Sequence, residues 1–152
     1  MAKTASKNKR RQAGGKTVKT TRLPKGPLSP TFLAVLTRVV ITPKEIVHPD
    51  KVTSFQTGPM VWLIFNQTNS DQNVTIDPGS FVDANTNRPD NPLTTGDPIS
   101  RLVPARKKLA LIGIIRDDAH QISYRYEIGA QNQITRDIKT IDPDLDVVDP
   151  RP

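Results

Sequence analysis

The sequence contains no cysteine, which excludes disulfide bonds, thiolate metal ligands and thiol nucleophiles together. It also lacks any run of about 20 apolar residues, the length that a membrane-spanning helix needs. The first apolar segment, residues 31–36, starts about 30 residues into the chain, whereas a signal peptide needs a longer apolar core close to its start. We therefore expect a soluble protein without a membrane span, located inside the cell in the cytoplasm.

Apolar and aromatic residues are scarce, at 35% and 5% of the chain, while proline occurs 14 times. A chain of 152 residues has room for one domain with a hydrophobic core, but this composition indicates that part of it stays unfolded. Residues 1–30 are almost free of apolar side chains and end in a proline-rich spacer. We therefore predict a disordered arm over residues 1–30 and a folded domain over residues 31–152.

Acidic residues are absent from the first 26 positions, which hold nine basic ones: Lys3, Lys7, Lys9, Arg10, Arg11, Lys16, Lys19, Arg22 and Lys25. The rest of the chain contains 13 basic and 15 acidic residues, so its net charge without the arm is about −2, compared with +7 for the whole chain. Such an arm attracts nucleic acid of any sequence through counterion release. A solubilising tail and an arm that binds an anionic membrane surface are the alternatives.

The rest of the chain shows the two-residue alternation of β-strands rather than a helical period. Residues 33–41 and 122–128 alternate, and residues 60–65 and 109–115 are continuously apolar, as in strands covered on both faces. Shorter pieces lie at 45–55, 73–76 and 145–148, and residues 83–98 form a long polar loop. About seven short strands separated by turns predict an all-β protein, an antiparallel Greek-key β-sandwich.

Five segments, taken in order, resemble the cupredoxin-like family of β-sandwiches over about residues 35–149: ITPKEI (41–46), VWLIFNQT (61–68), VPA (103–105), ISYRYEI (122–128) and DPDLDV (142–147). The resemblance implies a cupredoxin-like fold. Copper-binding members of the family place a histidine and a cysteine at the positions that fall here near Asn73 and Ile128. Because a blue-copper site needs two imidazoles and a thiolate, the resemblance implies neither a copper cofactor nor electron transfer.

Few other residues suggest chemistry. The only histidines, His48 and His120, lie in turn-like stretches, where we expect them to be exposed to solvent. One alternating set of acidic residues lacks the glycine and glutamate of a calcium loop and fits the solvent face of an edge strand: Asp142, Asp144, Asp146 and Asp149. No nucleophile-elbow or phosphate-binding glycine motif is present. These observations predict that the chain is not an enzyme and takes no metal, cofactor or small-molecule substrate.

The aromatic residues of the strands allow two interpretations. Trp62, Phe65, Tyr124 and Tyr126 fit the core of a small sandwich, and they also fit stacking platforms for bases. The core is the favoured interpretation.

We therefore expect a non-catalytic structural or binding protein whose arm binds nucleic acid and whose sandwich mediates self-assembly or protein contacts. Small viral coat proteins share this layout, and this analogy adds a virion as a second location after the cytoplasm. Residues 31–42 are apolar on both faces of a strand, and loop 83–98 is too polar to cover them, which predicts self-association through Leu33 and Leu36. The alternative is a copper-free cupredoxin-like interaction module whose arm docks on an acidic protein partner.

Overall fold

The computed structural model describes residues 34–150. The nine basic residues of the arm, Leu33 and the predicted boundary between arm and domain lie outside the described residues. Between 34 and 150 the chain forms strands, turns and one 3-10 turn, Pro78–Ser80. The prediction of an all-β sandwich is confirmed.

The described chain has more strands than the sequence predicted, twelve rather than about seven. They are β1 (Val35–Ile41), β2 (Ile46–Val47), β3 (Lys51–Phe55), β4 (Pro59–Asn66), β5 (Gln72–Ile76), β6 (Val82–Asp83), β7 (Ile99–Val103), β8 (Lys108–Ile114), β9 (Ser123–Arg125), β10 (Ile128–Asn132), β11 (Ile138–Ile141) and β12 (Asp144–Val148).

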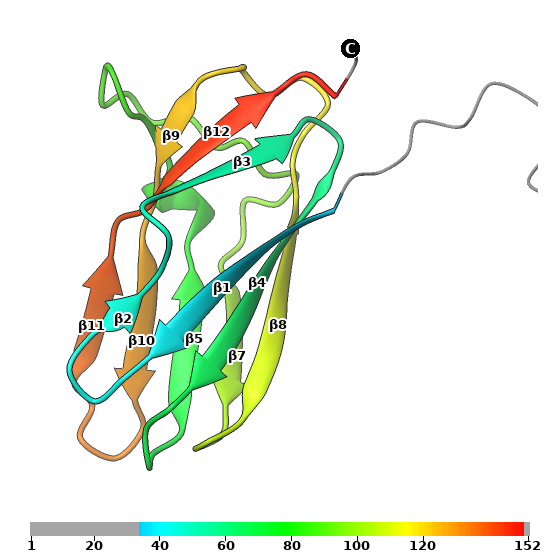
Figure 1. Cartoon of the computed structure of the whole chain (residues 1–152). Coiled ribbons are helices and arrows are strands. Elements are labelled where there is room, and N and C mark those ends of the chain that lie inside the picture. The colour runs from blue at the N-terminus through cyan, green and yellow to red at the C-terminus, as the bar shows by residue number, and fades with distance from the viewer. Residues whose placement is uncertain (1–33, 151–152) are drawn as a thin grey trace, which may run out of the picture. The chain divides into compact units, whose positions relative to one another are not determined.

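The strands form three sheets, in the orders β2-β1-β4-β8, β11-β10-β5-β7 and β3-β12-β9-β6. In Figure 1 the first sheet packs across the second, and the third closes one end of the sandwich. Two pairings are parallel, β1 with β4 and β3 with β12, so the sandwich is mixed rather than wholly antiparallel. Both pairings join strands that are far apart in the sequence, which local alternation does not reveal.

The predicted strand over 122–128 is split between two sheets. Its backbone leaves the ladder after Arg125, where the Tyr126 amide donates to the Pro143 carbonyl and the Glu127 amide donates to the Ser80 hydroxyl. The two halves are β9, which pairs with β12, and β10, which pairs with β5. This interruption lets one chain segment belong to both the second and the third sheet.

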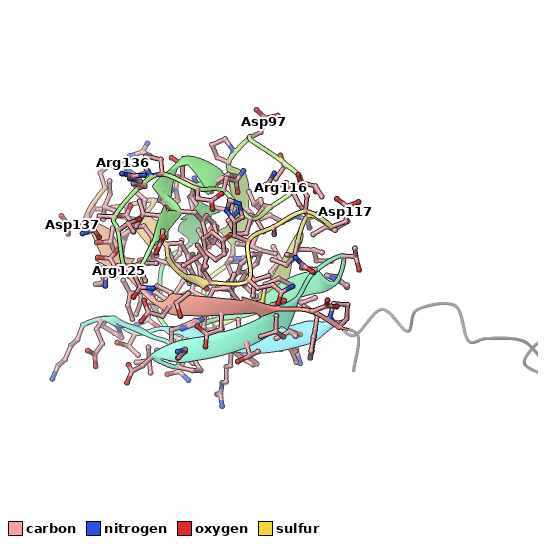
Figure 2. The ribbon with its side chains drawn as sticks, turned by 90° about the horizontal axis from the view of Figure 1, so that it is seen from above. Asp97, Arg116, Asp117, Arg125, Arg136 and Asp137 are labelled. Carbon is pink, nitrogen blue, oxygen red and sulfur yellow. The ribbon has the colours of Figure 1, made fainter. Side chains whose placement is uncertain are left out.

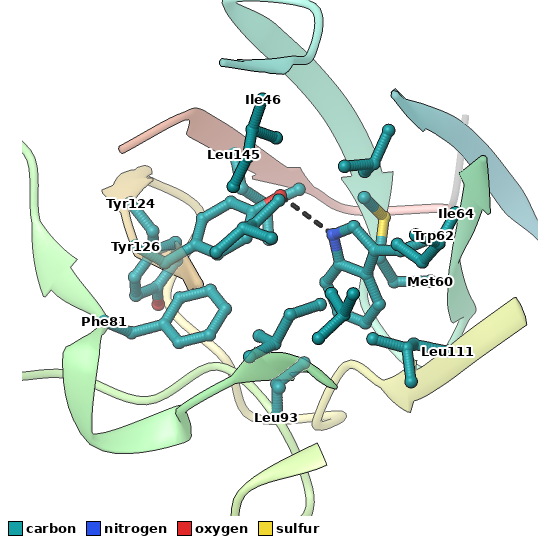
Figure 3. Packing of buried hydrophobic residues seen from close by; sticks show 14 of the residues in the cluster. Ile46, Met60, Trp62, Ile64, Phe81, Leu93, Leu111, Tyr124, Tyr126 and Leu145 are labelled. Atoms are coloured by element: carbon teal, nitrogen blue, oxygen red, sulfur yellow. Dashed lines mark hydrogen bonds between the residues drawn. The ribbon is translucent and has the colours of Figure 1, made fainter. Parts of the chain in front are cut away.

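The core lies between the sheets and is centred on Trp62, which is fully buried. Its indole Nε1 donates to the Tyr126 hydroxyl at 2.9 Å (Figure 3). The Phe81 ring stacks on Tyr126 with centroids 4.6 Å apart. Gly113 of β8 lies against the indole, because a Cβ there would be 3.1 Å from the Trp62 ring. The core interpretation is confirmed for Trp62, Tyr124 and Tyr126, whereas Phe65 lies on the opposite face of β4.

The polar loop 83–98 is folded onto its own domain. Leu93 is buried in the core and forms a β-bridge with Ile115. The Asp90 carboxylate lies 2.7 Å from His120 Nδ1 and 3.7 Å from the Arg116 guanidinium. These contacts tie the loop to the β8–β9 connection, at the end of the sandwich viewed in Figure 2, where Asp97 and Asp117 point away from the body.

Candidate interaction surfaces

The outer face of the β2-β1-β4-β8 sheet is apolar over neighbouring strands. Its register places Leu36 of β1 beside Val61 of β4, and Val61 beside Ile112 of β8. The apolar face consists of Leu36, Val61, Leu63, Ala110, Ile112 and Ile114. The exposed fractions are 65% for Leu36, 59% for Ile112 and 49% for Ile114.

This face corrects one expectation about the strands. Residues 60–65 and 109–115 were predicted to be covered on both faces, but within residues 34–150 only their inner faces are buried. The buried Met60, Trp62 and Ile64 alternate with Val61 and Leu63, which are only partly exposed. Apolar runs of this kind normally lie under a second layer. The described domain does not supply that layer.

The size of the apolar face can be estimated from strand geometry. The six residues lie within about five residues of each of three neighbouring strands, which span about 16 Å by 15 Å, or roughly 240 Å² in projection. This is close to the lower end of the range of about 300–600 Å² for the largest apolar patch on a monomer, a patch that is often functional. Leu36, one of the two residues predicted to mediate self-association, lies level with Val61 and Ile112 in the middle of this face. The other, Leu33, lies outside the described residues.

A second surface lies at the end of the sandwich where β1, β4 and β7 finish and β5, β8 and β11 begin, here called the basic end. It carries six basic residues and three acidic ones: Lys44, Arg106, Lys107, Lys108, Arg136 and Lys139, with Glu45, Asp71 and Asp137. The whole described chain has 12 basic and 15 acidic residues, so its positive charge is concentrated here. An uneven field of this kind attracts anions to one end of the domain.

A cleft of about 340 Å³ lies at the basic end. Its lining combines an aromatic ring, two amides and three cations: Phe65, Asn66, Gln67, Arg106, Lys107 and Lys108. The volume is at the lower end of the range for ligand pockets, about 300–1,000 Å³. None of the lining residues is acidic.

The floor of this cleft is fixed by Asn66, which is buried at the end of β4. Its amide nitrogen donates to the carbonyls of Ser70, Val103 and Pro104. Its amide oxygen accepts from the Thr68 backbone amide and hydroxyl. One side chain therefore holds the β4–β5 turn against the end of β7, and it fixes the start of the turn that carries the three cations.

Phe65 differs from the other strand aromatics because it faces outward. It lies opposite Val40 and Lys108 in the ladder, and the Arg38 guanidinium carbon is 4.6 Å from its ring centroid. A cation at that distance over an aromatic face is a favourable contact. The alternative interpretation of the aromatics, a platform for stacking, is thus open for Phe65 only.

The two histidines have different environments. His48 is buried, with Nε2 3.2 Å from the Thr37 hydroxyl and Nδ1 next to the Pro49 carbonyl, so the expectation of solvent exposure is wrong for it. Burial lowers the pKa of His48 below its ordinary value, although the Pro49 carbonyl and the Asp50 charge oppose this shift. The side chain of His120 is 71% exposed, as expected.

The acidic residues of β12 do not lie on an edge strand, because β12 pairs with both β3 and β9. Asp146 forms an ion pair with Lys51 at 2.8 Å and accepts from the Ser123 hydroxyl. Asp144 lies 3.7 Å from the Arg125 guanidinium. Their alternate spacing therefore reflects cross-strand ion pairs.

The positions at which copper-binding cupredoxins carry ligands are separated in this sandwich. Asn73 pairs with Gln131, whereas Ile128 pairs with Ile76 and is buried in the core. Residues 34–150 contain no group of three or more His, Cys, Asp or Glu side chains placed to hold a metal ion. No helix in the same range is long and apolar enough to cross a membrane.

The cations of the cleft were missed at the sequence level, although the run Arg106-Lys107-Lys108 is visible there. Its signal was hidden because the nine arm residues dominate the positive charge of the chain. What distinguishes the run is its position in a turn beside an outward-facing aromatic, which depends on the pairing of β4 with β8.

Comparisons with known proteins name no family. No protein-family model and no curated protein matches the chain. One solved structure that it resembles is a family 123 glycoside hydrolase from Clostridium perfringens, with a TM-score of 0.41 and 12% identity over 68% of this chain and 24% of the hydrolase. Another is Lac15 from a marine microbial metagenome, with a TM-score of 0.37 and 12% identity over 80% of this chain and 33% of Lac15.

The prediction that the chain is not an enzyme is contradicted by the hydrolase among these structures and is withdrawn. The chain spans about a quarter to a third of the length of these two proteins. The likeness assigns neither an activity nor a substrate to it. The resemblance to cupredoxins stays a prediction.

Proposed function

We propose that this chain is a self-associating nucleic-acid-binding protein. Two copies pair through the apolar face of the β2-β1-β4-β8 sheet, and the polybasic arm binds nucleic acid without sequence preference. The observation that carries the proposal is the apolar face itself, in which Leu36, Ile112 and Ile114 are each about half exposed or more.

A second copy is the occupant that fits this face best. Sheets pack face to face with strands about 30° apart and a layer of interdigitated side chains between them. A standard interface covers about 800 Å² of accessible surface on each partner, with an apolar centre and a polar rim. The apolar face supplies a centre of the appropriate size. Arg38 and Lys108 lie at its border, where their charges stay in water.

The contribution of the arm rests on its charge. Nine basic residues without an acidic one release counterions when they meet phosphates, which gives binding that weakens steeply with salt. Self-association adds to this effect, because two linked arms bind one polyanion with higher avidity than a single arm.

Sedimentation at high salt tests the pairing, since salt suppresses contacts made by the arm. We expect a dimer at tens of micromolar, and a folded monomer for Leu36→Asp and Ile112→Asp. The matched control is Ile138→Asp on β11, because Ile138 is also 65% exposed but lies on the opposite sheet. A monomeric wild-type protein, or equal dissociation by the control, would overturn the pairing.

Fluorescence anisotropy with a labelled oligonucleotide tests the arm. Replacing the nine basic residues by glutamine in the full chain should remove most of the salt-dependent affinity. Unchanged binding by this variant would refute the role of the arm. Binding to an acidic protein in preference to nucleic acid would favour the interaction module instead.

A further inference from the structure

We infer that the basic end is a second nucleic-acid site, in which the cleft beside Phe65 binds a single strand. Lys107 and Lys108 contact its phosphates, and Phe65 stacks on one of its bases. This inference deepens the proposed function by adding a contact on the folded domain to the one made by the arm.

The charges of the cleft are available to a ligand. Among residues 34–150, no carboxylate forms an ion pair with Arg106, Lys107 or Lys108. The guanidinium of Arg106 donates from both Nε and a terminal nitrogen to the Asn69 amide oxygen, a neutral acceptor that leaves its charge uncompensated. The Asp71 carboxylate touches the same turn, where it accepts from the Ala105 backbone amide at 2.9 Å. Three adjacent cations without a paired acid attract phosphates strongly.

The backbone of the cleft is held in place before any ligand binds. The Lys107 amide donates to the Pro104 carbonyl at 3.1 Å, and the Asn66 amide donates to the Lys107 carbonyl at 2.9 Å. Arg106 has a φ of 61°, a left-handed conformation that is uncommon for residues other than glycine. Together with the clamp made by the Asn66 side chain, these bonds fix the directions in which the cations leave the turn. A preorganised site loses less conformational entropy on binding.

The aromatic ring and the amide favour a single strand over a duplex. Bases of a single strand are free to stack on side chains, which every base can do with its π face. The Gln67 side chain lines the same cleft and offers both a donor and an acceptor to a base edge. A duplex hides its π faces and would use the cations alone.

A second cleft extends the track. It has a volume of about 530 Å³, and its lining includes Gln67 and Arg38. Gln67 thus borders both clefts. Lys108 lies opposite Phe65 in the ladder, and the Arg38 guanidinium lies over the face of the Phe65 ring. A strand that follows this track would pass from Lys108 to Phe65, where a stacked base takes the place of the Arg38 guanidinium on the ring face and frees that cation for a phosphate.

The test measures the affinity of the full chain for a short labelled oligothymidylate over a range of salt concentrations. Lys107→Gln with Lys108→Gln should reduce the slope of log K against log salt by about 1.4, or about 0.7 per lost phosphate contact. The control is Arg88→Gln with Arg101→Gln, which removes the same charge from exposed residues outside the cleft. It should leave the slope almost unchanged.

Phe65→Ala supplies a second readout, with an expected loss of roughly 5- to 150-fold for the single strand and little change for a duplex of the same length. Circular dichroism confirms that each variant is folded, and Phe65→Trp should restore binding and give a fluorescence signal when a base stacks.

The two proposals fail separately. Equal slopes for the lysine pair and the control pair would overturn the cleft, whatever the arm contributes. Equal losses for single strand and duplex on Phe65→Ala would overturn it as well, as would preferential binding to vesicles of anionic lipid. A third outcome is that the variant with a neutralised arm keeps its slope of log K against log salt and loses it when Lys107 and Lys108 are also replaced. That result would support the nucleic-acid site in the cleft and refute the role of the arm.

Discussion

Tyr126→Phe tests the centre of the core. The substitution removes one hydroxyl and leaves the ring stacked on Phe81. Its main consequence falls on Trp62, whose indole nitrogen loses its acceptor at 2.9 Å in a fully buried position. Leaving a buried donor unsatisfied costs about 1–3 kcal/mol. For a domain of this size, that corresponds to a decrease in Tm of roughly 3–6 °C per kcal/mol.

The chain supplies its own probe, because Trp62 is the only tryptophan. Urea unfolding followed by its fluorescence should show a lower midpoint with an unchanged m-value, since the surface exposed on unfolding stays the same. Tyr124→Phe is the matched control. Its hydroxyl donates to the carbonyl of the exposed His120 at 3.1 Å, so the substitution removes a donor and leaves only a carbonyl acceptor, and the loss should be smaller.

Two results would refute the reasoning. A loss below about 0.5 kcal/mol for Tyr126→Phe would mean that the indole nitrogen finds another partner or reaches water. A loss for Tyr124→Phe as large as that for Tyr126→Phe would mean that burial of the donor does not set the cost.

Burial raises the pKa of Tyr126 and of Tyr124 well above the ordinary value of about 10. Above that pH these tyrosines ionise only in the unfolded chain, so the free energy of unfolding should fall as pH rises. Tyrosinate absorbance should appear together with the loss of native Trp62 fluorescence, and ionisation of either tyrosine in the folded state would contradict this. Burial lowers the pKa of His48. Below about pH 6.5 the unfolded chain therefore binds a proton that the folded chain does not, and the free energy of unfolding should fall as pH decreases. His48→Gln should weaken this pH dependence in urea unfolding, and an unchanged dependence would refute the role of His48. Gly113→Ala places a Cβ 3.1 Å from the Trp62 ring and should cost about 1–3 kcal/mol, whereas Gly96→Ala, with nothing within 4 Å, should be nearly neutral in the same assay.

Local patterns in the sequence predicted the strands in which apolar residues mark a buried face. The alternation over 33–41 became β1, and the apolar run over 60–65 became β4. The short β7 and β11 were missed. Ile99–Val103 places three consecutive exposed residues in its centre, and Ile138–Ile141 has no buried residue, so neither shows a buried face in its composition. These strands are held by pairing with β5 and β10, which is a long-range property.

The functional surfaces depend on the same long-range pairings. Leu36 and Ile112 are 76 positions apart in the sequence and meet on one face only because both β1 and β8 pair with β4. The sequence indicated that β1 is apolar on both sides, and this reasoning identified Leu36. It could not show that β4 and β8 also lack a cover on that side, because a continuous apolar run is the same for a covered and an uncovered strand.

The two proposed surfaces constrain each other when two copies pair. In a face-to-face dimer the two-fold axis lies between the sheets, either along the strands or across them. An axis along the strands places both basic ends on the same side, where six basic and three acidic residues from each copy would repel their equivalents. An axis across the strands places them at opposite ends, and like-charge repulsion favours this arrangement. Two short oligonucleotides should then bind per dimer, one at each end. A long strand should link dimers into larger particles, because one dimer presents its clefts about a domain length apart and facing in opposite directions.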